Sequence, residues 1–257
     1  MSIVKRVAYF VGLPILLVLI WWVLTLGPKN FFVPTPGELG QTFFEVWAGP
    51  RFVTDFIPSV IRLIIGLIAT IVLGIVLGVL IGSFRWLRSL TEPLLEFFRA
   101  IPPPVLVPLF LLLIGPTDQM RIAVIVSGAI WPVLLNTVEG VRAVDEVLVN
   151  TSRTYRIDGF ARLRHLVLPA ASPQIMAGVR QSLSIGLILM VISEMFGGSS
   201  GLGFTIVLYQ RSFAIPEMWS GIIVLGLIGI ALSMISKAAE GMVLRWYRGL
   251  KEVQRDS

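Results

Sequence analysis

The sequence predicts an all-α integral membrane protein, and three of its features support this class. Of the 257 residues, 56% are hydrophobic and only 14% are charged, whereas soluble domains carry about 25% charged residues. The mean hydropathy is +0.88. Runs with almost no charge recur along the chain, and as helices they are long enough to cross a hydrocarbon layer about 30 Å thick.

We expect six transmembrane helices. The first run follows Lys5 and Arg6 and resembles a signal peptide, but it is too long for one and no small-x-small cleavage site follows, so we interpret it as a retained span. Three successive prolines, Pro102 to Pro104, cannot lie inside a helix, so the third span begins after them or is kinked there. The predicted spans are residues 7–28, 63–84, 100–117 (entered from about Pro93), 122–138, 173–195 and 218–236.

The net charge of +6 is explained by membrane orientation and does not indicate nucleic-acid binding. If the N-terminus is inside, thirteen Lys and Arg residues fall in inside segments and four in outside segments. Basic residues are enriched in cytoplasmic loops. We therefore expect a multi-pass protein of the inner or plasma membrane, embedded in the lipid bilayer with both termini cytoplasmic. The loop 142–172 is then cytoplasmic and is the most basic segment.

Three glycines in the second span predict close helix packing. Gly74, Gly78 and Gly82 are spaced at i, i+4 and i+8 and therefore form one stripe on the helix. Helices in lipid associate through close backbone approach at such stripes.

Glu194 is one of the few ionisable residues in the apolar runs, and it lies just before a glycine-rich turn at 197–203. Charges inside membranes are costly and commonly mark functional sites. Two interpretations stay open: a substrate or gate residue, or a carboxylate that caps backbone N–H groups of the turn.

The sequence does not predict an enzyme. It has no P-loop pattern, no cysteine and no metal-ligand cluster in a span. Residues 197–201 match G-x-S-x-G. However, the single histidine, His165, belongs to the loop that we place across the membrane from Ser199.

The cytoplasmic loop predicts two short amphipathic helices. Apolar residues recur at helical spacing from Val144, Asp158-Gly159 forms a turn, and a second stripe from Phe160 ends before Pro169. Such a loop either lies on lipid headgroups or docks into a partner protein.

This loop resembles the "EAA" loop of binding-protein-dependent ABC importer permeases, whose pattern is E-A-A-x3-G-x9-I-x-L-P. Leu166, Leu168 and Pro169 fit its end, whereas residues 150–152 and Arg156 replace the E-A-A and the glycine. Other stretches are similar to the nitrate/sulfonate/taurine type of permease, and the resemblance covers about residues 33–245. These stretches are 33–37, 59–66, 98–103, 108–110 and 194–204.

The resemblance implies a type I ABC importer permease fold with a cytoplasmic coupling helix. Residues 1–58 would hold the first span and an external amphipathic connection, 59–245 the permease core with the coupling loop 142–172, and 246–257 a cytoplasmic tail. Two permease copies, forming a homodimer, would pass a small solute, such as a nitrate-, sulfonate- or taurine-like anion, from an external solute-binding protein. Two cytoplasmic ABC ATPase subunits would bind ATP and Mg, and this chain would hold no cofactor.

The resemblance also suggests two groups of functional residues. The ATPase would bind the coupling loop at Arg153, Tyr155, Arg156, Asp158, Gly159 and Phe160. The translocation pathway would run near Trp131, Asn136, Met190 and Glu194. A stand-alone secondary transporter is the alternative function, and such proteins commonly show inverted repeats.

Overall fold

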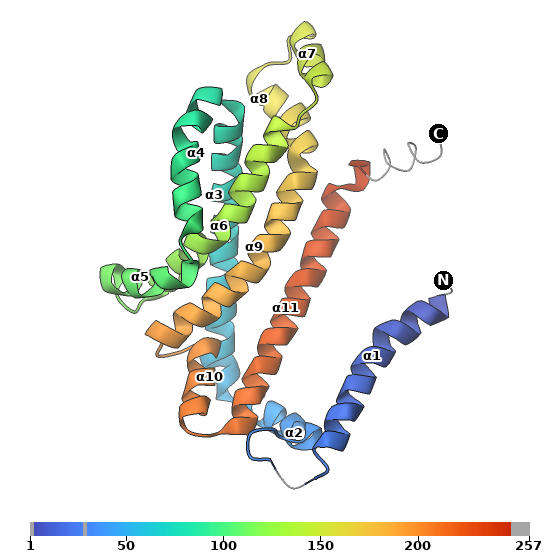
Figure 1. Ribbon diagram of the computed structural model, residues 1–257, viewed down its shortest axis with the longest axis vertical. Coiled ribbons are helices and arrows are strands. Elements are labelled where there is room, and N and C mark those ends of the chain that lie inside the picture. Colours follow the sequence, from blue (N-terminus) through green and yellow to red (C-terminus); the bar gives the residue numbers. More distant parts are fainter. Residues whose placement is uncertain (1–2, 28–29, 248–257) are drawn as a thin grey trace.

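The computed structural model describes residues 3–27 and 30–247, and each regular element in these ranges is helical (Figure 1). The predicted tail 246–257 lies outside the described residues from 248 onward. The elements are α1 (Ile3–Leu24), α2 (Pro36–Trp47), η1 (Phe52–Phe56), α3 (Ile57–Ser83), α4 (Arg85–Ala100), η2 (Pro103–Val105), α5 (Leu106–Ile114), α6 (Asp118–Arg142), α7 (Glu146–Thr154), α8 (Gly159–Arg162), η3 (Leu163–Val167), α9 (Leu168–Gly197), α10 (Leu202–Arg211) and α11 (Ile215–Val243).

Four continuous helical segments in the described chain are long and apolar enough to cross a membrane. They contain α3, α6, α9 and α11, and they correspond to the second, fourth, fifth and sixth predicted spans. The bent pair of α4 and α5 raises the number to five if it is one span. The first predicted span corresponds to α1, whose residues Gly12–Leu24 form a shorter apolar helix.

The third predicted span is broken, and its predicted bounds are wrong. Helix α4 begins at Arg85, ahead of the entry expected near Pro93, and Pro93 lies inside it. The chain then bends by 78° between α4 and the segment Pro103–Ile114. The break falls at Ile101-Pro102, where three successive prolines begin, because proline lacks an N–H donor and disfavours helical backbone at the residue before it. The helix break that the prolines predict is therefore confirmed.

Helices α3, α6 and α9 form the centre of the molecule (Figure 1). Their contacts depend on small residues. A Cβ placed on Gly78 would lie 2.5 Å from Thr137 Cβ, and one on Gly74 or Gly82 would lie 2.8 or 2.9 Å from the Cβ of Val133 or Val141. The glycine stripe of α3 therefore lies directly on α6.

Helix α9 packs against the other face of α6 in the same way. A Cβ on Gly178 would lie 2.5 Å from Pro132 O, and one on Gly140 would lie 3.1 Å from Ala171 Cβ. Backbones can approach this closely only where side chains are absent, and van der Waals packing is then the main force between helices in lipid.

Two π turns follow from proline residues and are not anticipated by the sequence. Each π turn ends two residues before a proline, η1 before Pro58 and η3 before Pro169. Their i→i+5 hydrogen bonds, Ile57 N to Phe52 O and Leu168 N to Leu163 O, let the helix continue past a residue without an N–H. The expected stop before Pro169 is therefore wrong, and Gly159–Phe196 forms one continuous segment.

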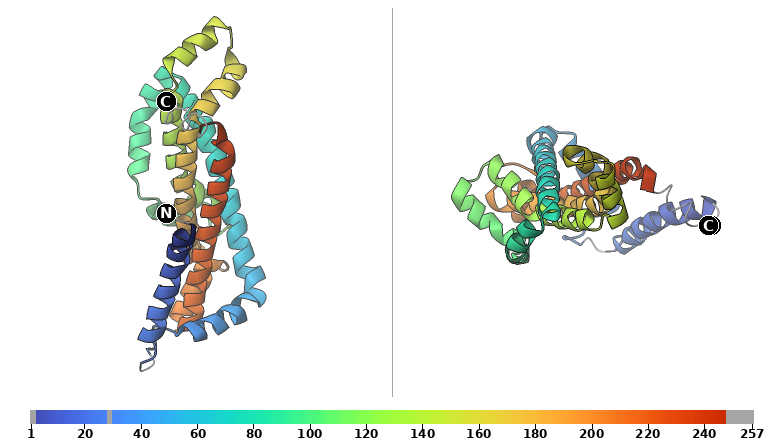
Figure 2. Two further views of the ribbon diagram at one scale, coloured as in Figure 1. Left: turned by 90° about the vertical axis from the view of Figure 1, so that its right-hand side faces the viewer. Right: turned by 90° about the horizontal axis from the view of Figure 1, so that it is seen from above.

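The remaining helices lie at the edge of this centre. Helix α2 crosses the end of the bundle opposite α7, where Trp47 Nε1 donates to Ser220 Oγ of α11 (3.0 Å). Helix α1 contacts α2 and then leans away from the bundle, whereas α7 and α8 project beyond its other end (Figures 1 and 2).

Candidate functional site

A buried charged cluster joins α3, α6 and α9 at the end of the bundle opposite α7. Its centre is Glu194, near the end of α9, which has no exposed surface. The Glu194 carboxylate accepts hydrogen bonds from Ser59 Oγ (2.7 and 2.9 Å), Arg62 Nη1 (2.8 Å) and Gly203 N–H (3.0 Å). Each oxygen of this buried anion is therefore satisfied.

Arg62 connects Glu194 to a second carboxylate. Its Nε donates to Asp118 Oδ1 at 2.8 Å, and Arg121 Nη1 donates to the same oxygen at 2.7 Å. The Arg62 side chain is only 6% exposed, whereas that of Asp118 is 60% exposed. The cluster therefore extends from a dry centre at Glu194 to an open edge at Asp118.

The same cluster holds the glycine-rich turn in front of α10. The N–H groups of Gly201, Leu202 and Gly203 donate to Asp55, Ser59 and Glu194, at 2.9, 2.9 and 3.0 Å. Three successive amides at a helix N-terminus thus find side-chain acceptors from other helices. Gly201 has φ +116°, and a Cβ there would lie 2.5 Å from Glu194 Oε2, so both backbone and space require glycine.

One of these contacts, from Gly203 N–H to Glu194, is of the kind that the capping interpretation of Glu194 predicts. Asp55 and Asp118 are not among the site residues predicted from the sequence, and Ser59 and Arg62 are included there only within the stretch 59–66 of the resemblance. Asp55, Ser59 and Arg62 are spaced at i, i+4 and i+7, which places them on one helix face. That spacing is the signal that could have found them.

The loop between α7 and α8 is shaped by a left-handed residue at Arg156. Helix α7 ends with Ile157 N donating to Ser152 O (2.8 Å) and Arg156 N donating to Arg153 O (3.0 Å). This pair of bonds is a Schellman motif, whose left-handed position is commonly glycine. Arg156 occupies that position with φ +54°, and Gly159 has φ +55°. Arg156 thus takes a backbone conformation that glycine adopts more readily.

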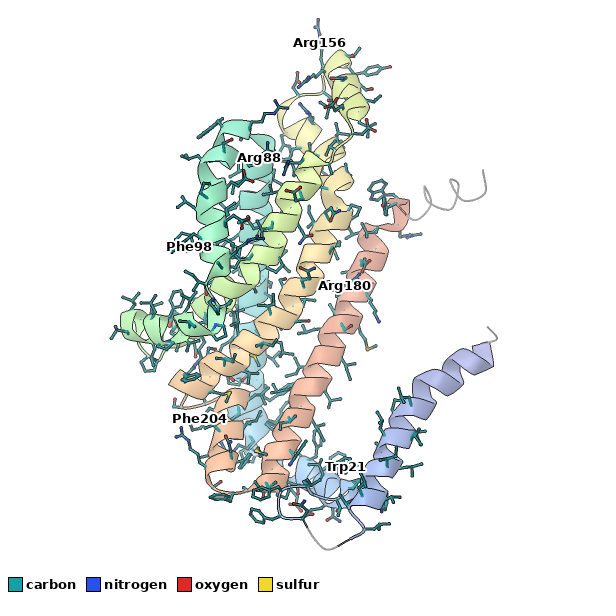
Figure 3. The ribbon with its side chains drawn as sticks, in the orientation of Figure 1. Trp21, Arg88, Phe98, Arg156, Arg180 and Phe204 are labelled. Carbon is teal, nitrogen blue, oxygen red and sulfur yellow. The ribbon has the colours of Figure 1, made fainter. Side chains whose placement is uncertain are left out.

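Arg156 lies at the tip of the molecule (Figure 3), and the turn around it exposes aromatic side chains. Tyr155 is 74% exposed and Phe160 is 72% exposed. Arg153 donates weakly to Asn150 Oδ1 (3.5 Å), and Asp158 precedes α8 at its N-cap position without a side-chain cap bond. The structure therefore brings all six predicted docking residues together on one protruding turn.

The predicted pathway residues fall into two groups. Trp131 and Asn136 border a hollow of about 460 Å³ on one face of α6 and α9, together with Arg99 and Gln181. Trp131 stacks on Phe98 at a centroid distance of 6.5 Å. Met190 and Glu194 are fully buried and do not border this hollow.

No group of three or more His, Cys, Asp or Glu side chains that could hold a metal ion occurs in the described part of the chain.

Comparisons with known proteins agree with this architecture. Residues 70–249 match the family described as "Binding-protein-dependent transport system inner membrane component". The chain is 30% identical over 246 residues to the putative aliphatic sulfonates transport permease protein SsuC of Bacillus subtilis (strain 168), covering 94% of this chain and 89% of that protein. It is 24% identical over 251 residues to the taurine transport system permease protein TauC of Escherichia coli (strain K12), covering 95% and 91%. A chain of the MetNI methionine ABC transporter in an inward-facing conformation has a TM-score of 0.60 at 18% identity, covering 72% of this chain and 93% of that chain.

Proposed function

The chain belongs to the family of binding-protein-dependent transport system inner membrane components, and we propose how this permease subunit of an ABC importer is assembled and driven. It is a multi-pass inner-membrane protein with the type I importer permease fold. The family is a transport family, so the chain is a permease rather than an enzyme or a stand-alone secondary transporter.

In the proposed assembly, two copies of the chain enclose the pathway and two cytoplasmic ATPase subunits drive it. The ATPases bind ATP and Mg, and an external solute-binding protein delivers the solute. Six spans cross the membrane: α1, α3, the bent pair of α4 and α5, α6, α9 and α11. Both termini are cytoplasmic. The distribution of Lys and Arg supports this orientation, as does the return of α11 toward the end that carries α7 (Figure 1).

The exposed turn between α7 and α8 carries the proposed coupling role. Tyr155 and Phe160 each expose more than 70% of their surface. Aromatic side chains are enriched at protein interfaces because they bury a large area at low entropic cost. A protruding turn with two such side chains fits insertion into a groove of an ATPase subunit. The contact would be shaped and bordered by the other residues of the turn, Arg153, Arg156, Asp158 and Gly159.

The hollow beside Trp131 and Asn136 is the proposed pathway surface. A second copy facing it would close the route. Arg99 and Gln181 supply a cation and a polar group there, although Arg99 is also paired with Glu96 at 2.6 Å. A small anion such as a sulfonate or a taurine-like solute fits this lining, in keeping with the names of the relatives. Met190 and Glu194 would reach the route only after movement of the helices around them.

Co-purification with the ATPase subunit of the same transport system tests the proposed coupling role. Tyr155→Ala combined with Phe160→Ala should abolish ATPase co-purification and solute uptake while leaving membrane insertion intact. Phe44→Ala is a matched control, because Phe44 is 71% exposed but lies on α2 at the opposite end. Wild-type co-purification and uptake in the double variant would contradict the proposal.

A further inference from the structure

A second hollow, of about 740 Å³, lies at the end of the bundle that carries the coupling loop. Its walls come from the connection between α3 and α4, the end of α6, and the start of α8 and η3. The hollow therefore joins the membrane-spanning helices to the base of the loop. It is separate from the hollow beside Trp131 and from the charged cluster at Glu194.

Four arginines line this hollow, and no carboxylate does. Arg142 is paired with Glu139 at 2.7 Å. The side chains of Arg85, Arg88 and Arg162 make no hydrogen bond or ion pair with any described residue, and Arg162 Nε is buried without a partner. Figure 3 shows Arg88 on α4, near the end of the bundle that carries α8. A buried donor without an acceptor is costly, so this lining favours an anion.

The rest of the lining is mainly apolar. Val79, Leu80 and Phe84 form the wall that comes from α3 and its connection to α4, and Leu163 and Val167 come from η3. Leu80 and Phe84 are 44% and 50% exposed. A ligand that suits both kinds of wall carries an anionic group and an apolar tail. A free inorganic anion would leave the apolar wall uncovered.

We propose that this hollow binds the phosphate group of an anionic phospholipid from the leaflet at the loop side of the membrane. Arginine guanidinium groups bind phosphate oxygens through paired, charge-assisted hydrogen bonds. Basic pockets between helices at the cytoplasmic membrane surface bind such headgroups in other membrane proteins. The acyl chains lie along Leu80 and Phe84. The phosphate connects Arg88 of α4 with Arg162 of α8 and so steadies the base of the loop.

Native mass spectrometry of the full chain in nanodiscs tests this site. The nanodiscs contain phosphatidylcholine alone or mixed with phosphatidylglycerol. Wild type should retain phosphatidylglycerol, and Arg88→Glu combined with Arg162→Glu should weaken retention by about tenfold or more. Arg164→Glu is the matched control, because Arg164 is an exposed arginine of η3 that does not line the hollow. Arg88→Lys combined with Arg162→Lys keeps the charge and should retain part of the binding, which separates loss of the site from misfolding.

Any of the following results would overturn the proposal. Equal lipid retention by wild type and the Arg88/Arg162 charge-reversal variant would show that these arginines do not bind the lipid. A loss of retention in Arg164→Glu as large as in that variant would show only a general attraction of the lipid to basic protein. Inorganic phosphate that displaces phosphatidylglycerol, or that binds equally well in phosphatidylcholine discs, would identify a free phosphate as the ligand. If the Arg88/Arg162 charge-reversal variant lost ATPase co-purification but retained lipid as wild type does, the arginines would belong to the ATPase interface. The site does not depend on the coupling proposal, because Tyr155→Ala with Phe160→Ala should leave lipid retention unchanged.

Discussion

The buried pair of Arg62 and Glu194 should be a major determinant of stability, because each group is almost fully removed from solvent. Replacing Glu194 by Leu leaves the Arg62 guanidinium with Asp118 as its remaining carboxylate partner (2.8 Å). It also leaves the Ser59 hydroxyl and the Gly203 N–H without the acceptor that they share. Breaking a buried pair in this way costs about 3–5 kcal/mol. The contact with the half-exposed Asp118 places the expected loss near the lower end, at about 3 kcal/mol.

A double-mutant cycle separates the pair from its surroundings. Arg62→Met alone leaves the carboxylate buried with Ser59 and Gly203 as its donors, and it should also destabilise. The double variant Arg62→Met/Glu194→Leu leaves neither charge of the pair buried. It should therefore be more stable than the sum of the two single losses predicts, by about 2 kcal/mol.

Equilibrium unfolding in mixed micelles of dodecyl maltoside and sodium dodecyl sulfate, followed by tryptophan fluorescence, measures these free energies. Heat denaturation of membrane proteins is commonly irreversible and would report a rate instead. Additivity of the two single changes within about 0.5 kcal/mol would refute the pairing argument. A Glu194→Leu loss below about 1 kcal/mol would refute the burial argument.

Two further predictions concern backbone geometry. Gly78→Val should separate α3 from α6 and lower the free energy of unfolding by about 1–3 kcal/mol. Gly226→Val on α11 should change it little, since a Cβ there meets nothing within 4 Å. Equal losses for the two variants in the same unfolding assay would disprove the packing role. Arg156→Gly should relieve a left-handed conformation that costs about 1 kcal/mol and slow amide hydrogen exchange in α7; faster exchange than in wild type would contradict the assigned turn.

The helical spans are predictable because a long apolar run depends only on local sequence. The broken third span is only partly predictable. Its first half, α4, carries arginines and glutamates and therefore escapes a search for uncharged runs, although the prolines identify the break itself. The end of the loop is misjudged for a related reason. Pro169 normally limits a helix, but the π turn Leu163–Val167 supplies an alternative hydrogen bond that carries the helix past it.

The charged cluster is harder to predict, because it depends on contacts between distant parts of the chain. Ser59 and Glu194 are separated by 135 positions. A single sequence does not indicate which of its distant charged residues come into contact in the fold. The apolar context of Glu194 and the glycines after it indicate a special site. Arg62, which pairs with Glu194, and Asp118, which pairs with Arg62, lie near helix starts and look like ordinary membrane-boundary charges. Local spacing therefore identifies the turn, and only the fold identifies what holds it.

The positions of the cluster and the loop at opposite ends of shared helices have a mechanical consequence. Helix α9 continues directly from η3, at the base of the loop, to Glu194, and α3 runs from Arg62 to the arginine-lined hollow. Between these ends, glycines hold α3 and α9 against α6 at near-backbone distance, so little soft side-chain packing is left to absorb a displacement. A force on the turn at Tyr155 and Phe160 would then move α3, α6 and α9 as one body. Such a body can alter the position of the cluster only by rotating as a whole. The rest of the chain can adjust to this rotation at two places, which are the bend between α4 and α5 and the helix α1, which makes few contacts.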